Sequence, residues 1–148
     1  MTREEIAALV NDAVDRLLQH DQQLLDLKAC ERALHFKIAY YMAQSPLIRL
    51  PLTLDCEYNR HIGNEKRLQL PNRPKSSKAF PDILIHERNT DENNVLVLEI
   101  KRPGQSLSHD GEKLRAFVNQ LHYRHAGHLI VGHNRRGALI RELRWVDG

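Results

Sequence analysis

The segment Val95–Lys101, VLVLEIK, is almost continuously apolar, which is typical of a central strand covered on both faces. Arg102-Pro103-Gly104 ends it. Side chains of a strand alternate between its two faces, so Glu99 and Lys101 share one face, roughly 6–7 Å apart at ~3.3 Å per residue. A carboxylate and an ammonium group at the end of so apolar a strand require a partner or a function.

A second strand is predicted just before this one, over Ile83–His86, and Pro81-Asp82 opens it. The polar, turn-rich residues 89–94 separate the two strands, which favours an antiparallel pair with Asp82 close to Glu99. Two carboxylates beside a lysine suit Mg²⁺, which prefers oxygen ligands and is held by one or two carboxylates together with water and phosphate. The alternative is a structural ion pair of Lys101 with Glu99 or Asp82.

The remaining elements complete an α/β pattern. Residues 52–58 alternate between apolar and polar and predict a further strand, and residues 111–126 predict a helix that ends at Gly127. Residues 128–131 and 138–146 predict two more strands. A meander of three strands, a crossover helix and further strands indicate a mixed central β-sheet flanked by helices.

The N-terminal third is predicted to be helical. Thr2 and Glu5 fit a capping box, and residues 6–18 repeat apolar positions at helical spacing. A second helix is expected from about residue 22 to residue 43. Glu31 interrupts its apolar stripe, so this carboxylate either reaches water at the edge of the stripe or points into a site. We expect a single domain over 1–148, with 1–20 as an additional helix and 21–148 as the core.

Composition favours an ordinary globular domain. The chain has 148 residues, of which 41% are hydrophobic and 28% charged. No apolar run reaches the roughly 20 residues of a membrane helix, so no membrane partner is expected. Two cysteines do not make a disulfide scaffold, and a cytoplasmic location is expected.

Charge is distributed unevenly along the chain. Residues 1–57 hold 6 Lys/Arg against 9 Asp/Glu, whereas residues 58–148 hold 16 against 10. A loop of polar and turn-forming residues from 61 to 79, with little that could be buried, is expected beside Asp82. Its cations suit a phosphodiester backbone, although a solvated surface explains them equally. The only aromatic residue beside it is Phe80, just after its end, which does not favour stacking on single strands. The candidate nucleic-acid contacts in this loop are Lys66, Arg67, Arg73, Lys75 and Lys78.

The arrangement of Pro81-Asp82 followed by Glu99-Ile100-Lys101 resembles the PD-(D/E)XK nuclease superfamily. That superfamily has a restriction-endonuclease-like core of helix, three-stranded meander, helix and strand, and the resemblance extends from about residue 30 to residue 131. It implies that Asp82, Glu99 and the carbonyl of Ile100 bind Mg²⁺ or Mn²⁺, and that Lys101 acts on the attacking water. Some members place a glutamate on the first core helix, where Glu31 is expected.

Three other residues are candidates. Glu57, at the end of the first meander strand, is a further acidic candidate for the catalytic site, unless it simply faces solvent. Gln120 and Lys113, on the helix after the motif, are candidate nucleic-acid contacts, and a solvated helix face is the alternative.

The sequence therefore predicts a metal-dependent nuclease that hydrolyses phosphodiester bonds, with DNA favoured over RNA. One alternative is a catalytically inactive protein of the same fold that binds nucleic acid or a partner protein. A small dimeric structural module, a homodimer without a catalytic role, is a further alternative, favoured if the apolar face of residues 6–18 is exposed and pairs with itself.

Overall fold

The computed structural model describes residues 1–71 and 73–148. Its centre is a sheet with the strand order β1-β6-β7-β8-β9. β7 and β8 run parallel, and every other neighbouring pair is antiparallel. The predicted α/β class with a mixed sheet is therefore confirmed. The strands are β1 Thr53–Cys56, β6 Ile83–His86, β7 Leu96–Lys101, β8 His125–His133 and β9 Leu139–Val146.

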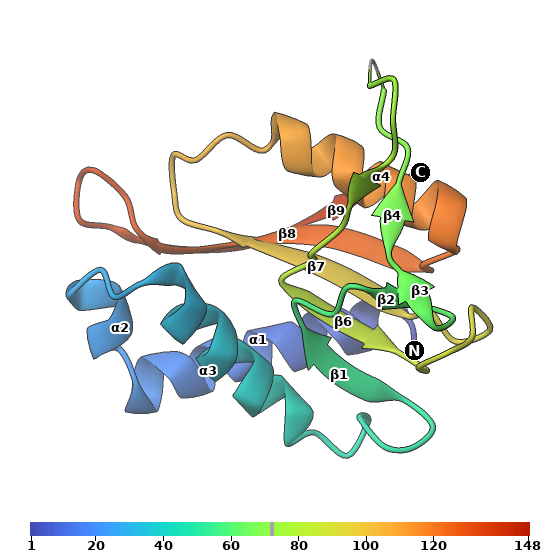
Figure 1. Ribbon diagram of the computed structural model, residues 1–148. Coiled ribbons are helices and arrows are strands. Elements are labelled where there is room, and N and C mark those ends of the chain that lie inside the picture. Colours follow the sequence, from blue (N-terminus) through green and yellow to red (C-terminus); the bar gives the residue numbers. More distant parts are fainter. Residues whose placement is uncertain (72) are drawn as a thin grey trace.

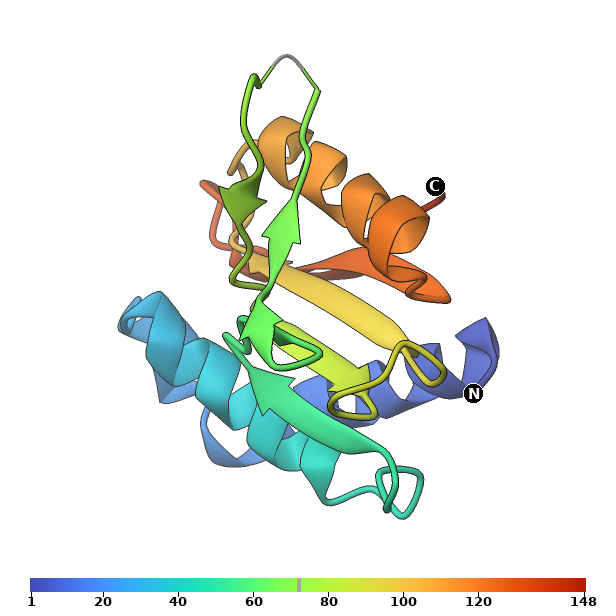
Figure 2. The same cartoon turned by 45° about the vertical axis from the view of Figure 1, so that its right-hand side comes forward.

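Helices cover both faces of the sheet (Figures 1 and 2). α1 (Arg3–His20) and α3 (Glu31–Ala43) pack on one face, while α4 (Ser108–Leu121) packs on the other and connects the parallel pair β7 and β8. In the described residues, no helix is both long enough and apolar enough to span a membrane.

Two hydrophobic cores explain why β7 is almost continuously apolar. Leu96, Leu98 and Ile100 pack in the core beneath α1 and α3, whereas Val97 packs in the core beneath α4. Each fully buried side chain of this kind contributes about 1.5–3 kcal/mol. Glu99 and Lys101 share one face of the strand, as predicted, and this face is turned towards α4.

α1 is an integral part of the first core. The predicted capping box is present, because Thr2 Oγ1 accepts from the Glu5 N–H and the Glu5 carboxylate accepts from the Thr2 N–H. The apolar face of the helix is buried inside the chain, with Ile6 and Leu17 fully covered. The condition set for the dimeric module, an exposed face over residues 6–18, is therefore not met.

The expected helix over residues 22–43 is in fact two helices, α2 (Gln23–Asp26) and α3. Lys28 takes a left-handed conformation, with φ 49°, and the N–H groups of Lys28 and Ala29 bond back to Leu25 and Leu24. This is a Schellman ending built on lysine instead of glycine, so no glycine marks the helix end in the sequence. The break places Glu31 in the first turn of α3, where the helix dipole favours a carboxylate.

The segment between residues 61 and 79 is more ordered than predicted. It contains two small hairpins, β2–β3 and β4–β5, and the second runs alongside α4 in Figure 1. Leu68 and Leu70 are buried in the core beneath α4, because alternate residues of the segment face that helix. The expectation that little here could be buried is wrong. The strands are β2 Arg60–His61, β3 Asn64–Glu65, β4 Arg67–Leu68 and β5 Ser77–Lys78.

Two predicted boundaries also move. The last helix ends at Leu121 because His122 adopts a left-handed conformation, with φ 54°. Gly127 is not a helix cap but part of β8, where an added Cβ would lie 3.0 Å from the Arg144 carbonyl oxygen. β1 stops at Cys56, since Glu57 also has a positive φ, of 49°, and turns the chain out of the strand.

A candidate active site at the end of β7

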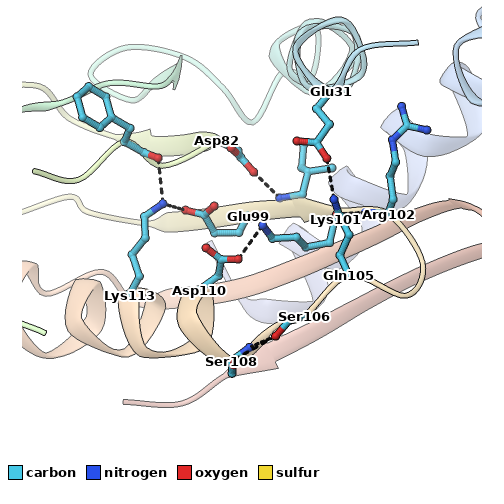
Figure 3. A network of polar contacts seen from close by, with 12 residues as sticks. Glu31, Asp82, Glu99, Lys101, Arg102, Gln105, Ser106, Ser108, Asp110 and Lys113 are labelled. Atoms are coloured by element: carbon cyan, nitrogen blue, oxygen red, sulfur yellow. Dashed lines mark hydrogen bonds and ion pairs between the residues drawn. The ribbon is translucent and has the colours of Figure 1, made fainter. Parts of the chain in front are cut away.

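Asp82 lies beside the end of β7, where the sequence predicts it. β6 and β7 pair with Ile83 opposite Leu98, so Asp82 sits one position beyond the paired residues, next to Glu99. Its Oδ2 accepts a hydrogen bond of 2.7 Å from the Ile100 N–H. This bond fixes the carboxylate against β7, and Figure 3 shows Asp82, Glu99 and Lys101 gathered there.

Glu99 is a buried carboxylate with an incomplete set of partners. Only 3% of the residue is exposed. Its Oε1 forms an ion pair of 2.5 Å with Lys113 Nζ. Burial raises the pKa of Glu99 to about 8; Lys113 opposes this shift and the charge of Asp82 adds to it. Lys113 alone therefore does not balance the charge of these carboxylates, and the site can accept a further cation.

The side chain of Lys101 is held in place by a residue of α4. Its Nζ lies 2.7 Å from Asp110 Oδ2, in the first turn of that helix. Burial acts to lower the pKa of Lys101, but the bond to Asp110 and its charge outweigh burial, so the pKa is raised. Lys101 is therefore an ammonium group at neutral pH. Sequence reasoning missed Asp110 because the helix was expected to begin at residue 111.

Glu31 reaches the same end of β7 from the opposite face of the sheet. It is exposed, and its Oε1 accepts a 2.8 Å bond from Gln105 Nε2 (Figure 3). The Arg102 guanidinium donates to the Ala29 carbonyl just before α3. The loop after β7 thus connects the start of α3 to the candidate active site, and Glu31 lies at the edge of that site.

A surface groove opens on the α3 side of Asp82. We call it the α3 groove; its space, including the part open to solvent, is about 580 Å³. His35 Nδ1 lies 3.4 Å from Asp82 Oδ1, and Arg32 Nε lies 3.7 Å from Glu57 Oε1. Glu57 is therefore near Asp82 through this groove, on the same side as α3. The groove is lined by Arg32, His35, Phe36, Cys56, Glu57 and Asp82.

A second groove opens on the α4 side, and we call it the basic groove. Lys113 contributes to its wall and donates a 3.0 Å bond to the Phe80 carbonyl. Arg73 and Lys78 also line it, as predicted cations of the 61–79 segment, whereas Lys75 is exposed outside the lining. The basic groove is lined by Leu68, Leu70, Arg73, Ser77, Lys78, Ala79, Phe80, His109, Asp110 and Lys113.

Two other predicted contacts serve local structure. The Arg67 guanidinium donates to the hydroxyl and carbonyl oxygens of Ser76. The Gln120 side chain forms two bonds with the backbone of Gln69, at 2.9 and 2.8 Å. Both residues hold the hairpin segment in place, Arg67 within it and Gln120 against α4.

Lys66 does not reach the surface at all. Only 2% of it is exposed, and its Nζ donates a 3.2 Å bond to the Tyr123 hydroxyl. The rings of Tyr58, Phe117 and Tyr123 surround the ammonium group, with centroids 5.2–5.8 Å away. A buried lysine of this kind is unavailable to a phosphate backbone, so its sequence interpretation as a nucleic-acid contact does not fit the structure.

Lys66→Met is expected to stabilise the protein at pH 7. Burial lowers the pKa of Lys66 to about 8 from 10.5. The ionised side chain therefore opposes folding below about pH 8, and this cost disappears between pH 8 and 10.5. We expect the variant to be more stable by roughly 1–3 kcal/mol at pH 7, with the difference shrinking towards pH 10.5. Urea unfolding of both proteins between pH 7 and pH 10.5 measures this difference in the free energy of unfolding.

The matched control is Lys78→Met, which removes an exposed lysine that is 2.6 Å from Glu65. Its stability change should be small, because exposed ion pairs contribute little. A Lys66→Met variant that is less stable than wild type at pH 7 would show that the three rings and Tyr123 outweigh the cost of burial.

The donor set is suited to Mg²⁺ or Mn²⁺. The described residues contain no group of three or more His, Cys, Asp or Glu side chains arranged to hold a metal. Mg²⁺, however, is commonly held by one or two carboxylates, with waters and substrate phosphates completing the shell. Asp82 and Glu99 supply two carboxylates, and the buried Glu99 carboxylate already faces a positive charge, the Lys113 ammonium group. The residues present therefore fit a divalent cation of this class.

No family model, curated protein or solved structure matches this chain. The resemblance to PD-(D/E)XK nucleases thus rests on the residues of the motif and on the order of the elements around them.

Proposed function

We propose that this chain is a metal-dependent nuclease with a restriction-endonuclease-like core. The observation that carries the proposal is the bond from the Ile100 N–H to Asp82, which brings Asp82, Glu99 and Lys101 together at one end of a buried strand. The order α3, β1, β6, β7, α4, β8 supports the fold assignment, since it follows the helix, meander, helix and strand of that superfamily.

Each residue of the site has a chemical task in this proposal. Asp82 and Glu99 would hold the cation, and the Ile100 carbonyl faces the same side, because the N–H and C=O of one strand residue point to the same edge. When bound, Mg²⁺ or Mn²⁺ lowers the pKa of water and neutralises phosphate charge. Lys101, an ammonium group fixed by Asp110, stabilises negative charge developing on the phosphate. Glu31 and Glu57 flank the site as acceptors for water or substrate.

The substrate is proposed to be a nucleic acid, with DNA favoured over RNA. Arg73, Lys78 and Lys113 line one groove that leads to Glu99 and Lys101 through their α4 partners. Cations arranged in this way neutralise successive phosphates and position the strand without reading its bases.

The decisive experiment measures metal binding and cleavage together. Mg²⁺ and Mn²⁺ are titrated calorimetrically into the wild-type protein, which is then incubated with linear duplex, circular duplex and single-stranded DNA. Metal binding together with metal-dependent cutting of at least one substrate is expected. DNA binding without metal binding or cutting would overturn the proposal.

A second candidate function is nucleic-acid binding without cleavage. The observation that favours it is the ion pair between Lys113 and Glu99, because an internal ammonium already faces a carboxylate that a metal would need. In that case the wild-type protein should not bind Mg²⁺ and Lys113→Met should gain Mg²⁺ binding, whereas the nuclease proposal expects the wild-type protein to bind Mg²⁺ already.

The salt dependence of DNA binding should identify the cations that contact phosphate. Arg73→Gln and Lys78→Gln are each expected to weaken binding to any sequence and to lower the slope of log K against log salt by about 1. Lys66→Met should leave the slope unchanged, because this lysine is buried. Fluorescence anisotropy at several salt concentrations, without divalent metal, measures the slope. An unchanged slope in both surface variants would show that the DNA does not bind in the basic groove.

A further inference from the structure

We infer that the α3 groove holds an unpaired base of the substrate, next to the phosphate that is cut, so that the enzyme acts on single-stranded or locally unwound nucleic acid. This inference rests on the proposed function and names the substrate class for the same site. It assigns a role to exposed aromatic residues that the sequence alone did not connect with Asp82.

Two aromatic rings lie exposed on the outer face of α3. Phe36 is 62% exposed and Tyr40 is 47% exposed. Their ring centroids are 6.2 Å apart and the planes differ by 26°. The inner face of the helix is buried in the core, through residues such as Leu34 and Ile38, so these rings are not needed for packing. Exposed aromatic rings of this kind are the platforms on which proteins stack unpaired bases.

The groove is continuous with the candidate active site. Phe36 forms one part of its lining and Asp82 another, and His35 Nδ1 lies 3.4 Å from the Asp82 carboxylate. A group lying against Phe36 is therefore adjacent to the residue proposed to hold the metal. The basic groove reaches the site from the other side, through Lys113 and Asp110, so cations for neighbouring phosphates lie across the site from the α3 groove.

The chemistry of the lining selects a base over other occupants. The Arg32 side chain is 86% exposed, and a guanidinium can stack on a base or pair with its phosphate. Glu57 and Asp82 provide carboxylate acceptors for amino groups. An apolar peptide has no side-chain donors for these two carboxylates, so covering them with one would be costly.

The backbone at Glu57 helps to form this wall. Its φ of 49° is uncommon for a residue other than glycine, and its N–H donates a 2.9 Å bond to the Pro81 carbonyl. The bond ties the end of β1 to the residue before Asp82. Glu57 and Asp82 are thus fixed together on one side of the groove, with the Phe36 ring also in its lining. A base in a duplex has both faces covered by its neighbours, so only an unpaired base can occupy this position.

The test compares oligonucleotide binding without divalent metal, so that cleavage plays no part. The probes are a fluorescent single strand, the same strand annealed into a duplex, and the single strand with abasic sites. Phe36→Ala is expected to weaken binding of the single strand about tenfold and to leave duplex binding unchanged. The abasic strand should bind wild type as weakly as the intact strand binds the variant. Leu27→Ala, which truncates a 77% exposed apolar residue outside the groove, is the matched control and should change nothing.

A second measurement does not depend on any substitution in the groove. Cys56 and Cys30 are both exposed free thiols, but only Cys56 lines the groove. The single strand should slow alkylation of Cys56 several-fold and leave Cys30 unaffected, as peptide mass spectrometry reports. Equal loss of single-strand and duplex binding in Phe36→Ala, or unprotected Cys56 under saturating single strand, would overturn the inference. So would a change of oligomeric state in Phe36→Ala, which would identify the aromatic face as a contact between copies.

The two proposals can fail separately. If wild type cuts duplex DNA with metal and Phe36→Ala has no effect on single strands, the nuclease stands and the base site is excluded. If the single strand binds through Phe36 and protects Cys56 but no substrate is cut, the base site stands and the nuclease is excluded.

Discussion

Asp82→Asn is expected to abolish Mg²⁺-dependent cleavage without unfolding the protein. The substitution removes the negative charge of one of the two proposed metal ligands. A bound metal supplies several kcal/mol of transition-state stabilisation, and each 1.36 kcal/mol is tenfold in rate, so the loss should be about a thousandfold or more. Single-turnover cleavage assays measure the rate, and calorimetry should show that Mg²⁺ binding is lost in parallel.

Asparagine is preferable to alanine for structural reasons. The Asp82 carboxylate accepts the 2.7 Å bond from the Ile100 N–H, and the amide oxygen of asparagine can accept the same bond. Alanine would leave that N–H unsatisfied, at a cost of about 1–3 kcal/mol, and a loss of activity could then reflect a loss of structure. Asp55→Asn is a useful control, because Asp55 is bonded to His86 and Arg88 away from the site. Undiminished cleavage by Asp82→Asn would exclude the metal site proposed here.

The centre of the fold was predictable because its signals are local. VLVLEIK fixes a strand covered on both faces, and the short polar turn before it fixes an antiparallel neighbour. Once those two strands pair, strand alternation and register place Asp82 and Glu99 together with no further information. The meander, the crossover helix and the following strand could likewise be read from apolar periodicity.

The parts that could not be predicted depend on contacts between distant segments. Lys28 ends a helix in a conformation usually taken by glycine. Glu31 therefore lies in the first turn of α3, not in the middle of an apolar stripe as predicted. Lys66 looked like a surface cation, but Tyr58 and Tyr123 enclose it from other elements. No pattern within one segment reveals such a neighbour.

The two lysines of the site differ in the partners that hold them. Lys101 pairs with Asp110, which is not a proposed metal ligand. Lys113 pairs with Glu99, which is one of the two proposed metal ligands. Metal binding would compete with Lys113 for Glu99 but would leave the Lys101–Asp110 contact intact. Lys101 is therefore the lysine whose position is maintained when the site is loaded, and Asp110 is its positioning residue.

Lys101→Met is expected to lower the cleavage rate about a hundredfold to a thousandfold, because it removes a fixed positive charge beside the phosphate. Metal affinity should change little, since the carboxylates of Asp82 and Glu99 remain. Asp110→Asn should lower kcat about tenfold to a hundredfold with little change in KM, because Lys101 keeps its charge but loses its orientation. Cleavage kinetics under saturating Mg²⁺ separate kcat from KM.

The double variant shows whether the two residues act as a unit. If Asp110 works only through Lys101, then Lys101→Met combined with Asp110→Asn should be no slower than Lys101→Met alone. Asp110→Glu should recover part of the rate, because it restores the carboxylate at a slightly different reach. Independent, multiplying losses would mean that Asp110 acts on the metal or the substrate directly, and the pairing of Lys101 with α4 would then be a stabilising contact without a part in the reaction.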